Sequence, residues 1–563
     1  MKPIKTFAAI IATMTMLAAF PGHAKLTRDQ RISDARAMIS LFEHRYAPAI
    51  WKSEYLDIDL DVIAATLLGE AYKQDMTDED FYAAMARMSG SVKDTHNWFL
   101  IPSSYYAYLD FGCDYVEGRY LIKHVNRQSL GNDVFPFERG DEIISMDGVP
   151  VWEIIEDLAK FDSQGNDLTE KRFLAGNLAY RPQKFFAHVP EGKVDVEIFS
   201  RLRGESQIVT LEWKHGGKPL AEAKSAAPYQ QSSMSLAAEI PLKNARALAD
   251  LENLRWSAVI EDKAHAMEDR IGDLKPFFPL WENFKILTEY PLFTGMFKLG
   301  GHNFGFIRIP TWSPQSPMAW LELMTKIIPR LEQETEALLI DQTNNGGGLI
   351  CLADIMSGFF VSTPIPNLKF QIRANRKRSE LYEAYVLQCE KQKKDSKECL
   401  AIIEIANELR RALAEGDSLT KGIDICGGDG MIHSVQDKSG RKYVYQKPLL
   451  ILVNEWSISA ADMFPAPLQD SGRAKIFGER TCGAGGSVIT TEYLGYSDFR
   501  VSQTETLAQR EKETIAPNGV STRYIENVGV TPDIHYSITT DDFLNNYSGY
   551  IEAVEKALLE MIR

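Results

Sequence analysis

One serine of the sequence occupies a position typical of a nucleophile. Residues 449–453 form an aliphatic run that predicts a buried strand. Ser459 follows in a polar turn, ahead of the helix-compatible residues 460–463, and a nearby Pro465 predicts that this helix is short or kinked. A serine between a core strand and a helix start is lifted out of the sheet, where free N–H groups can face an oxyanion. The structural alternative is that Ser459 only caps the helix N-terminus, the usual role of serine in such turns.

A second strand ends in a glycine-rich loop. Residues 337–348 read ALLIDQTNNGGG, an apolar run followed by two asparagines and three glycines. Successive glycines let backbone approach a ligand closely and present unobstructed N–H groups. No Lys-Ser/Thr pair follows them, which disfavours a phosphate-binding loop. A flexible loop after a strand remains the simpler interpretation of this segment alone.

These two segments and GRAKIFGERTCGAGG at 472–486 resemble the C-terminal-processing (tail-specific) serine peptidases. In that family a strand with an Asn-Gly-Gly loop precedes a Ser-x-Ser-Ala turn, and an Arg-Ala…Gly-Glu-x-Thr-x-Gly segment follows. The resemblance implies an α/β core of the crotonase (ClpP/crotonase) type with Ser459 as nucleophile. It further implies an oxyanion hole made by the N–H of Ala460 and one from the loop containing Gly347 and Gly348.

The chain departs from the familiar branch of the family at one position. That branch uses a Ser/Lys dyad with its lysine in a Thr-x-Gly-Lys-Gly segment, whereas Ala484 stands at the lysine position here. No lysine at this site can deprotonate Ser459. Either the chain is inactive or another base serves, and the usual one is a histidine oriented by a carboxylate.

Two further segments resemble the branch of this family that uses Ser/His/Glu, which includes the tricorn core and the chlamydial protease-like activity factor. KDTHNWFL at 93–100 offers His96 as the base, and YIENVGVTPDI at 524–534 offers Glu526 as its partner. We expect His96 to approach Ser459, with Glu526 on the opposite side of the imidazole. Taken singly, such a histidine is more often structural and such a glutamate more often solvated. Lys475 and Lys442 are the fallback bases.

Residues 1–24 have the composition of a Sec-type signal peptide. Lys2 and Lys5 precede an apolar stretch at 7–20 and a small-residue end, which predicts cleavage after Ala24. The apolar stretch is short for a membrane span and no later run is long enough, so we expect no membrane anchor and a periplasmic or extracellular location. The formal net charge of −15 argues against nucleic acid as a partner.

The cysteine content also fits an oxidising compartment. Six cysteines allow fifteen pairings if all are bridged, although buried free thiols are equally compatible with a chain of this length. Cys389 with Cys399 is the first pair to test, because both lie in a charged segment that predicts a helical hairpin. Cys482 lies in a glycine-rich turn with no identified base, which disfavours it as a nucleophile.

The pattern of hydrophobic residues divides the chain. Amphipathic helices are expected at 25–108, followed by short β runs at 109–215, where RGDEIISMDGVPVWEIIEDL (139–158) resembles a PDZ domain. PDZ domains bind extended peptides at a sheet edge. A linker and helical segment at 216–300 precedes the catalytic core at 301–563, which carries a helical insertion at 371–445. The small-residue stretch 221–237 is the candidate for an internal activating cut.

The combined expectation is a multidomain α/β serine endopeptidase, exported and acting on protein or peptide substrates. It needs no metal or organic cofactor, and the resemblance makes a homodimer plausible. A catalytically inactive homologue that binds peptides through its PDZ-like module is the main alternative. An acyl-CoA enzyme on a related crotonase-type core is less favoured, because a signal peptide does not fit it.

Overall fold

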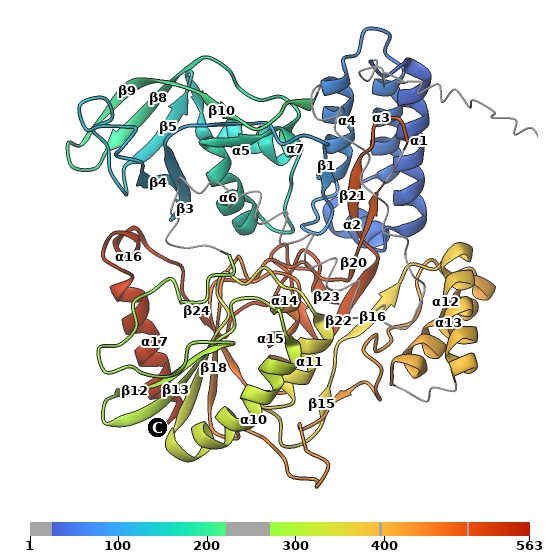
Figure 1. Ribbon diagram of the computed structural model, residues 1–563, viewed down its shortest axis with the longest axis vertical. Helices are drawn as coiled ribbons and strands as arrows, with labels where there is room; N and C mark the ends of the chain where they lie inside the picture. Colours follow the sequence, from blue (N-terminus) through green and yellow to red (C-terminus); the bar gives the residue numbers. More distant parts are fainter. Residues whose placement is uncertain (1–24, 221–270, 393–396, 493–494) are drawn as a thin grey trace, which may run out of the picture.

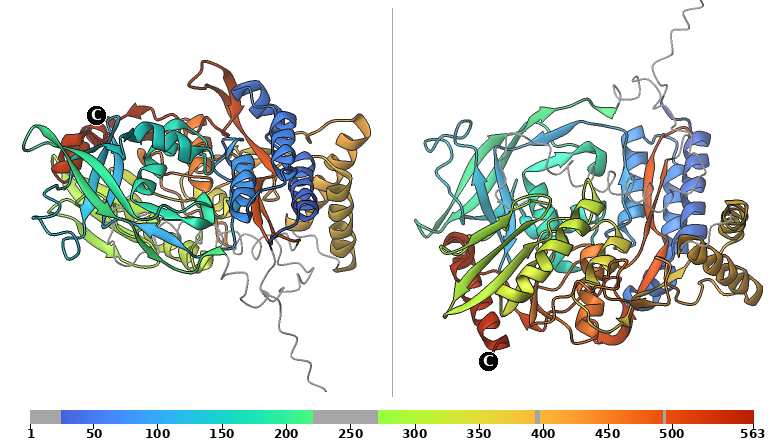
Figure 2. Two further views of the ribbon diagram at one scale, coloured as in Figure 1. Left: turned by 90° about the horizontal axis from the view of Figure 1, so that it is seen from above. Right: turned by 60° about the horizontal axis from the view of Figure 1, so that its bottom comes forward.

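A computed structural model describes residues 25–220, 271–392, 397–492 and 495–563. The predicted signal peptide and the candidate cleavage stretch 221–237 lie outside the described residues. The chain folds into an N-terminal helical unit, a β-rich module and a larger α/β core, which pack against one another (Figures 1 and 2). Among the described residues, no helix is both long and apolar enough to cross a membrane.

The N-terminal unit is helical, as the amphipathic pattern predicts. Its helices are α1 (Arg28–Arg45), α2 (Ala49–Leu56), α3 (Leu60–Ala71) and α4 (Asp78–Gly90). Capping boxes begin α1 at Thr27 and α4 at Thr77, which satisfies N–H groups that have no partner within the helix. The apolar faces of these helices enclose Phe99, Phe499 and Val501, so the unit is completed by residues from the far end of the sequence.

A small sheet joins this unit to the core. Its order is β1-β21-β20, from β1 (Phe99–Leu100), β21 (Arg500–Thr504) and β20 (Val488–Glu492). The β20–β21 hairpin belongs to the C-terminal third of the chain but lies among the N-terminal helices (Figure 1). The helical unit is therefore part of the core's own scaffold and is not an appended domain.

The β-rich module contains an antiparallel sheet of order β3-β4-β5-β8-β9, with β6 paired to β5. Its strands are β3 (Phe111–Val116), β4 (Arg119–Val125), β5 (Glu142–Met146), β6 (Val149–Pro150), β8 (Lys193–Ser200) and β9 (Glu205–Glu212). Helices α5 (Val151–Ala159), α6 (Asp167–Ala175) and α7 (Gln183–Phe186) belong to the same module. A second sheet is formed by β2 (Tyr106–Tyr108), β7 (Tyr180–Pro182) and β10 (Lys214–Gly216). Asp147 and Gly148 both adopt positive φ between β5 and β6, so the predicted turn is confirmed.

A seven-stranded sheet forms the centre of the core, in the order β11-β12-β13-β14-β18-β19-β24. Its strands are β11 (Lys285–Thr288), β12 (Phe293–Leu299), β13 (His302–Arg308), β14 (Ala337–Asp341), β18 (Leu449–Val453), β19 (Lys475–Gly478) and β24 (Ile534–His535). From β13 to β24 the pairing is parallel. The sheet begins at Lys285, inside the segment expected to be linker and helix, because β11 and β12 form antiparallel pairs with the strands that follow.

Helices cover both faces of this sheet, which explains the continuous apolar runs of β14 and β18. Leu338, Ile340 and Ile451 face α10 (Pro317–Glu334), α11 (Ile350–Ser357) and α14 (Ala460–Met463). Leu339 and Leu450 face α17 (Ser548–Met561) on the other side. The remaining core elements are α15 (Pro465–Asp470), α16 (Thr540–Leu544), β15 (Ile365–Pro366), β16 (Lys369–Ile372), β17 (Met431–Ile432), β22 (Thr506–Ile515) and β23 (Ser521–Tyr524).

The expected insertion is helical in its first part. A hairpin of α12 (Arg376–Gln392) and α13 (Lys397–Glu415) projects from one end of the molecule (Figure 2). Residues 416–445, which follow α13, consist mostly of turns and bends and are not helical as expected. Cys389 and Cys399, the pair singled out for testing, are bonded within the hairpin, and a second disulfide joins Cys351 of α11 to Cys426. Cys113 and Cys482 are buried free thiols.

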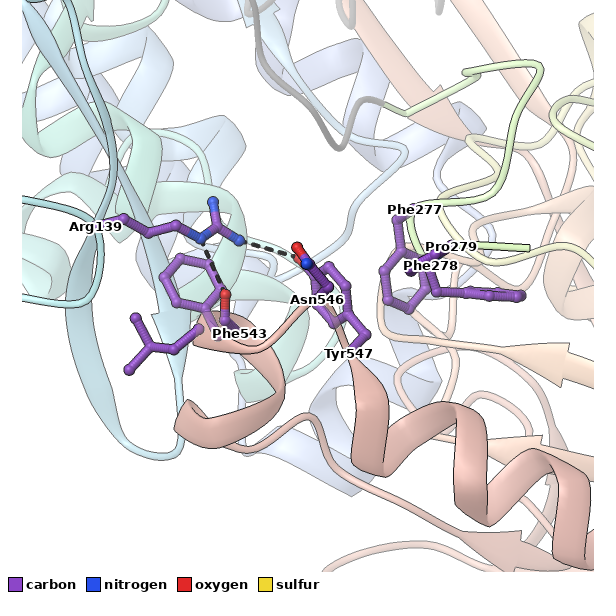
Figure 3. Close-up of a pocket in the computed structure, with 8 residues that line it drawn as sticks. Arg139, Phe277, Phe278, Pro279, Phe543, Asn546 and Tyr547 are labelled. Atoms are coloured by element: carbon purple, nitrogen blue, oxygen red, sulfur yellow. Dashed lines mark hydrogen bonds between the residues drawn. The ribbon is translucent and has the colours of Figure 1, made fainter. Parts of the chain in front are cut away.

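The β-rich module contacts the core through Arg139. The guanidinium lies 3.8 Å from the ring centre of Phe543, and its Nε donates to the Phe543 carbonyl oxygen at 2.9 Å (Figure 3). Its Nη2 reaches the hydroxyl of Tyr547 at 3.3 Å. An aromatic cavity of about 380 Å³, which Phe277 and Phe278 also line, lies at this contact. A charge-assisted hydrogen bond with a cation–π contact fixes the module against α16.

The two disulfides should stabilise the fold unequally. Cys351–Cys426 closes a separation of 75 residues between core segments, whereas Cys389–Cys399 closes 10 residues within one hairpin. On chain-entropy grounds the first contributes about 4 kcal/mol and the second about 3 kcal/mol, and loss of the second leaves the core untouched. Calorimetry should therefore show a larger fall in Tm for the double variant Cys351→Ser/Cys426→Ser than for Cys389→Ser/Cys399→Ser. Equal falls in Tm would contradict this assignment.

Candidate active site

Ser459 lies at the junction of β18 and α14, as the sequence predicts. Its side chain is buried, and its backbone adopts φ 58° and ψ −115°. Positive φ is costly for a residue with a Cβ and persists only where surrounding contacts impose it. The helix after Ser459 ends at Met463, and α15 begins at Pro465, which confirms the predicted break. The serine thus stands at a sharp, strained strand-to-helix turn.

The carboxylate of Asp462 imposes this conformation. Its Oδ2 accepts the N–H of Ser459 at 2.7 Å and the N–H of Ala484 at 3.1 Å. Its Oδ1 accepts the N–H of Gly483 at 2.8 Å and the hydroxyl of Thr481. Burial raises the pKa of this carboxyl to about 6, although all four donors favour the charged form. Asp462 therefore ties the serine turn to segment 481–484.

The glycine loop touches the serine directly. A Cβ added to Gly347 would lie 2.7 Å from the Cβ of Ser459 and 2.6 Å from the carbonyl oxygen of Ile458. The same atom would lie 3.3 Å from the N of Ala460, so the loop and the start of α14 face the same space. Gly347 and Gly348 have φ of 91° and 138°. Only glycine combines this backbone with so close an approach.

The backbone N–H groups expected to form the oxyanion hole differ in whether they already donate a hydrogen bond within the protein. The N–H of Gly347 donates to Oδ1 of Asn345 at 2.9 Å. That donor would have to exchange this bond before it could bind a substrate oxygen. Ala460 and Gly348 have no such bond among those of the described residues, so they are the better candidates.

His96 lies in the turn between α4 and β1 and is buried. Its N–H donates to Oδ1 of Asp94 at 2.9 Å, and Oδ2 of Asp94 accepts the hydroxyls of Tyr46 and Thr504 at 2.9 and 2.8 Å. The neighbouring Thr95 hydroxyl contacts the Cys482 sulfur at 3.1 Å. The histidine turn is thus anchored beside segment 481–485, the same segment that Asp462 ties to Ser459.

Glu526 is fully buried, and both of its carboxylate oxygens have partners. Oε1 accepts from Nζ of Lys52 at 2.5 Å, and Oε2 accepts from the N–H of Gly485 at 2.9 Å. Burial, and then the charge of Asp94, raise the pKa of Glu526 to about 7, while Lys52 acts in the opposite direction. Segment 481–485 therefore contacts the elements that carry all three predicted triad residues. The hydrogen bonds of the imidazole to Ser459 and Glu526 stay predictions.

The two lysines named as fallback bases are solvent-exposed, whereas Ser459 is buried. Lys475 is exposed and pairs with Asp533 at 3.2 Å, and Lys442 is exposed on another loop. Ala484 is fully buried in an apolar cluster that includes Ile458 and residues of the β-rich module. The position that carries lysine in the familiar branch is here part of an apolar contact between core and module.

Two charged residues of the site were missed from the sequence. Asp462 stands three residues after Ser459, the spacing of a capping box, and this spacing was the available signal. Lys52 gave no signal, because a lysine in an amphipathic helix is ordinarily solvated. Its side chain is instead completely buried against Glu526.

One cluster of the described residues has ligand atoms close enough to suggest a metal site. It consists of Asp354, Asp424 and Cys426. The sulfur of Cys426 is bonded to Cys351 and is not a thiolate, and burial raises the pKa of Asp354 to about 7. A disulfide sulfur offers no thiolate, so only the two carboxylates of this cluster could act as ligands and it does not fit a metal centre.

Comparison with known proteins supports a family assignment. Residues 303–536 match the profile of peptidase family S41, and residues 105–222 match that of a PDZ domain. An uncharacterized protein of Chlamydia muridarum is 26% identical, covering 98% of this chain and 96% of its own length. A Chlamydia trachomatis protein is 25% identical, covering 94% and 92%.

Solved structures agree with the fold. Mature CPAF complexed with lactacystin superposes with a TM-score of 0.72 and 24% identity, covering 95% of this chain and 99% of that one. Mature CPAF alone gives the same TM-score and identity. These matches confirm the expected fold class, a crotonase-like α/β core with a PDZ module and N-terminal helices.

The close approach of Gly347 to Ser459 predicts a specific destabilisation. Gly347→Ala combines left-handed strain of about 1–2 kcal/mol with overpacking of about 1–3 kcal/mol, so we expect a loss of about 3 kcal/mol. Gly430→Ala is the matched control, because Gly430 has φ 75° but open space where a Cβ would lie. It should cost about 1 kcal/mol. Equal denaturant midpoints for the two variants would contradict the described loop geometry.

Proposed function

Because the chain belongs to peptidase family S41 and carries a PDZ domain, we propose that it is an exported serine endopeptidase that works through an acyl-enzyme. The observation that carries this proposal is the turn at Ser459. The serine is held at positive φ beside a glycine loop whose backbone leaves room for nothing larger. Ser459 is the N-cap of α14, but an ordinary N-cap has extended backbone, so the positive φ beside N–H groups suits a nucleophile better.

The chemistry assigns one role to each predicted residue. Ser459 Oγ attacks the scissile carbonyl carbon while His96 accepts the hydroxyl proton, and the carbonyl oxygen becomes an oxyanion. The N–H of Ala460, with one from the glycine loop, donates to that oxygen. His96 then gives its proton to the leaving amine, and water hydrolyses the acyl-enzyme by the same steps. Glu526 orients the imidazole and stabilises its charged form.

The surroundings of Ala484 support histidine over lysine as the base. A catalytic lysine must be neutral, which requires a desolvated pocket that opens toward the serine. Here that position is fully buried in apolar packing between Ile458 and the PDZ module. His96 belongs to a turn that contacts Cys482 through the hydroxyl of Thr95, and Cys482 stands two residues before Ala484.

The PDZ module provides a site for the substrate chain. β3 is an edge strand of the module sheet, and α6 lies beside it, facing the core (Figure 1). An extended peptide would add to such an edge as a further strand. Arg172 of α6 binds Asp114 of β3 and Glu455 of the nucleophile turn, each at 3.1 Å. A peptide bound at β3 would therefore lie close to the catalytic turn.

An exported location is part of this proposal. Two disulfides form among the six cysteines, and such bonds persist mainly in oxidising compartments. The composition of residues 1–24 supports export through a Sec-type signal cleaved after Ala24.

Substitutions in the triad should abolish hydrolysis without unfolding the protein. Ser459→Ala and His96→Ala should each lower kcat/KM for an unfolded casein substrate by about four orders of magnitude, because triad members act as a unit. Glu526→Gln should lower it by a similar or smaller factor, since the base itself remains. Tm should stay near that of the wild type for the serine and histidine variants. Wild-type turnover in His96→Ala would assign the base elsewhere.

A lysine at position 484 should not replace the histidine. In the His96→Ala background, Ala484→Lys buries an unpaired ammonium in the apolar cluster, so Tm should fall and casein hydrolysis should not return. Recovery of hydrolysis would place the chain in the Ser/Lys branch. If the wild type binds peptides but cleaves none, the alternative of an inactive peptide-binding homologue takes the place of the peptidase.

A further inference from the structure

Lys52 is a fully buried lysine whose ammonium group has three acceptors. Nζ donates to Oε1 of Glu526 at 2.5 Å, to Oδ1 of Asn527 at 2.7 Å and to the carbonyl oxygen of Lys93 at 2.8 Å. An ammonium carries three hydrogens, so all of its donors are used. Side-chain exposure is 0% for both Lys52 and Glu526.

These acceptors come from the two segments that carry predicted triad residues. Glu526 and Asn527 belong to the segment after β23, and Lys93 stands three residues before His96. Asn527 reinforces the link, because its Nδ2 donates to the same Lys93 carbonyl oxygen at 2.8 Å. A single ammonium therefore fixes the carboxylate of one segment relative to the backbone of the other.

Further contacts of α2 and of the residue before it hold the same region. Nε1 of Trp51 donates to the carbonyl oxygen of Glu526 at 3.0 Å, and its ring stacks on Tyr55. The N–H of Ala47, just before α2, donates to the carbonyl oxygen of Thr504 at 2.9 Å. Adjacent residues of one helix thus hold both the backbone and the side chain of Glu526.

Such an ion pair is hard to explain by stability alone. Two charges removed from water lose solvation energy that their attraction only partly returns, and a well-packed apolar pair is often as stable. A cation beside a buried carboxylate does, however, favour its ionised form, and the hydrogen bond between them fixes the direction of the carboxylate.

We propose that Lys52 is a positioning residue, which holds Glu526 ionised and in the orientation that aligns His96. This inference rests on the proposed peptidase function and adds the N-terminal helical unit to its catalytic apparatus. Lys52 itself touches neither substrate nor the reacting atoms.

The charged groups around Glu526 set the expected pH dependence. Lys52 of α2 lowers its pKa, whereas burial and Asp94, in the turn before β1, raise it to about 7. Tyr46, at the end of α1, and Cys482 also lie within electrostatic reach of Glu526, and burial raises their pKa values so that both stay neutral. Without Lys52, two carboxyl groups would share an apolar site with no cation among these groups. Glu526 would then keep its proton to higher pH, and a neutral carboxyl stabilises an imidazolium poorly.

The test is the rate at which a fluorophosphonate probe labels Ser459, measured from pH 6 to pH 9 in Lys52→Met. A rise of about one pH unit in the pKa of Glu526 lowers its ionised fraction about fivefold at pH 7 and hardly at all at pH 9. We therefore expect a labelling deficit relative to wild type of about fivefold or more at pH 7 that disappears toward pH 9. Glu526→Gln should show a deficit at every pH, because its amide cannot ionise.

Lys123→Met is the matched control. Lys123 of the PDZ module pairs with Asp114 at 3.5 Å, with exposures of 2% and 4%. The same substitution there removes a buried cation whose carboxylate partner is Asp114 and not Glu526, so its labelling ratio to wild type should not change between pH 7 and pH 9. A pH-dependent deficit in Lys123→Met equal to that of Lys52→Met would overturn the proposal.

Thermal unfolding gives a readout that does not need activity. Because the folded-state pKa of Glu526 lies above its unfolded value of 4.5, this group's contribution to stability falls as pH rises from about 4.5 to 7. In Lys52→Met the fall should continue above pH 7, so the Tm difference from wild type should be larger at pH 8 than at pH 5. The double variant Lys52→Met/Glu526→Gln carries no unpaired charge and should lose this extra pH dependence. It also replaces the single variant if that one does not fold.

The outcomes separate the two proposals. If the wild type is not labelled at Ser459, the peptidase function fails, while the Tm measurements still report on the Lys52–Glu526 pair. If the wild type is labelled and Lys52→Met shows a deficit independent of pH, or none, Lys52 is only structural. If the double variant keeps the extra pH dependence of Tm, the carboxyl that Lys52 controls is not Glu526, and the inference is wrong.

Discussion

The carboxylate of Asp462 is the contact on which the geometry of the site depends. It binds the N–H of the candidate nucleophile and three donors from segment 481–484. This acceptor helps to offset the cost of a serine held at positive φ at the start of a four-residue helix. The same contact holds Gly485 where its N–H meets Glu526. One short-range capping interaction thus positions the strained serine turn and the segment that contacts Glu526 and Thr95, the neighbour of His96.

Near this contact lie three buried carboxylates, Asp462, Asp94 and Glu526, and the described structure pairs one of them with a lysine. Asp462 and Asp94 are satisfied by N–H and hydroxyl donors, whereas Glu526 receives a full ammonium from Lys52. Dipolar donors fix a carboxylate without adding charge, and a lysine adds a charge that must itself be satisfied. This distribution suits the proposed chemistry, in which an ionised Glu526 would orient His96. The N-terminal helices therefore contribute to the site, since α2 brings the ammonium of Lys52 to Glu526.

Local patterns in the sequence predicted the local features of the structure. The aliphatic run before Ser459, the break at Pro465 and the Asp147-Gly148 turn each follow from the residues that form them. The Cys389–Cys399 pair could be singled out from the sequence for the same reason, because both cysteines lie in one hairpin. The fold class was predicted through family resemblance, and the roles of His96 and Glu526 still rest on it.

Contacts between distant segments were not predictable in this way. Lys52 and Glu526 are 474 positions apart, and nothing in the helix around Lys52 indicates a buried partner. The Cys351–Cys426 pairing and the start of the core sheet at Lys285 depend likewise on how separate elements pack. Periodicity reports which face of an element is apolar, but it does not report which other element covers that face.

Activation of Ser459 by His96 is tested most directly by finding which residue forms a covalent adduct with a serine-reactive probe. Purified protein would be treated with a biotinylated fluorophosphonate and digested, and the modified peptide would be sequenced by tandem mass spectrometry. We expect a single adduct on Ser459 in the wild type and none in a folded His96→Ala variant under the same conditions. An adduct on another serine, or an equal yield on Ser459 without His96, would contradict it.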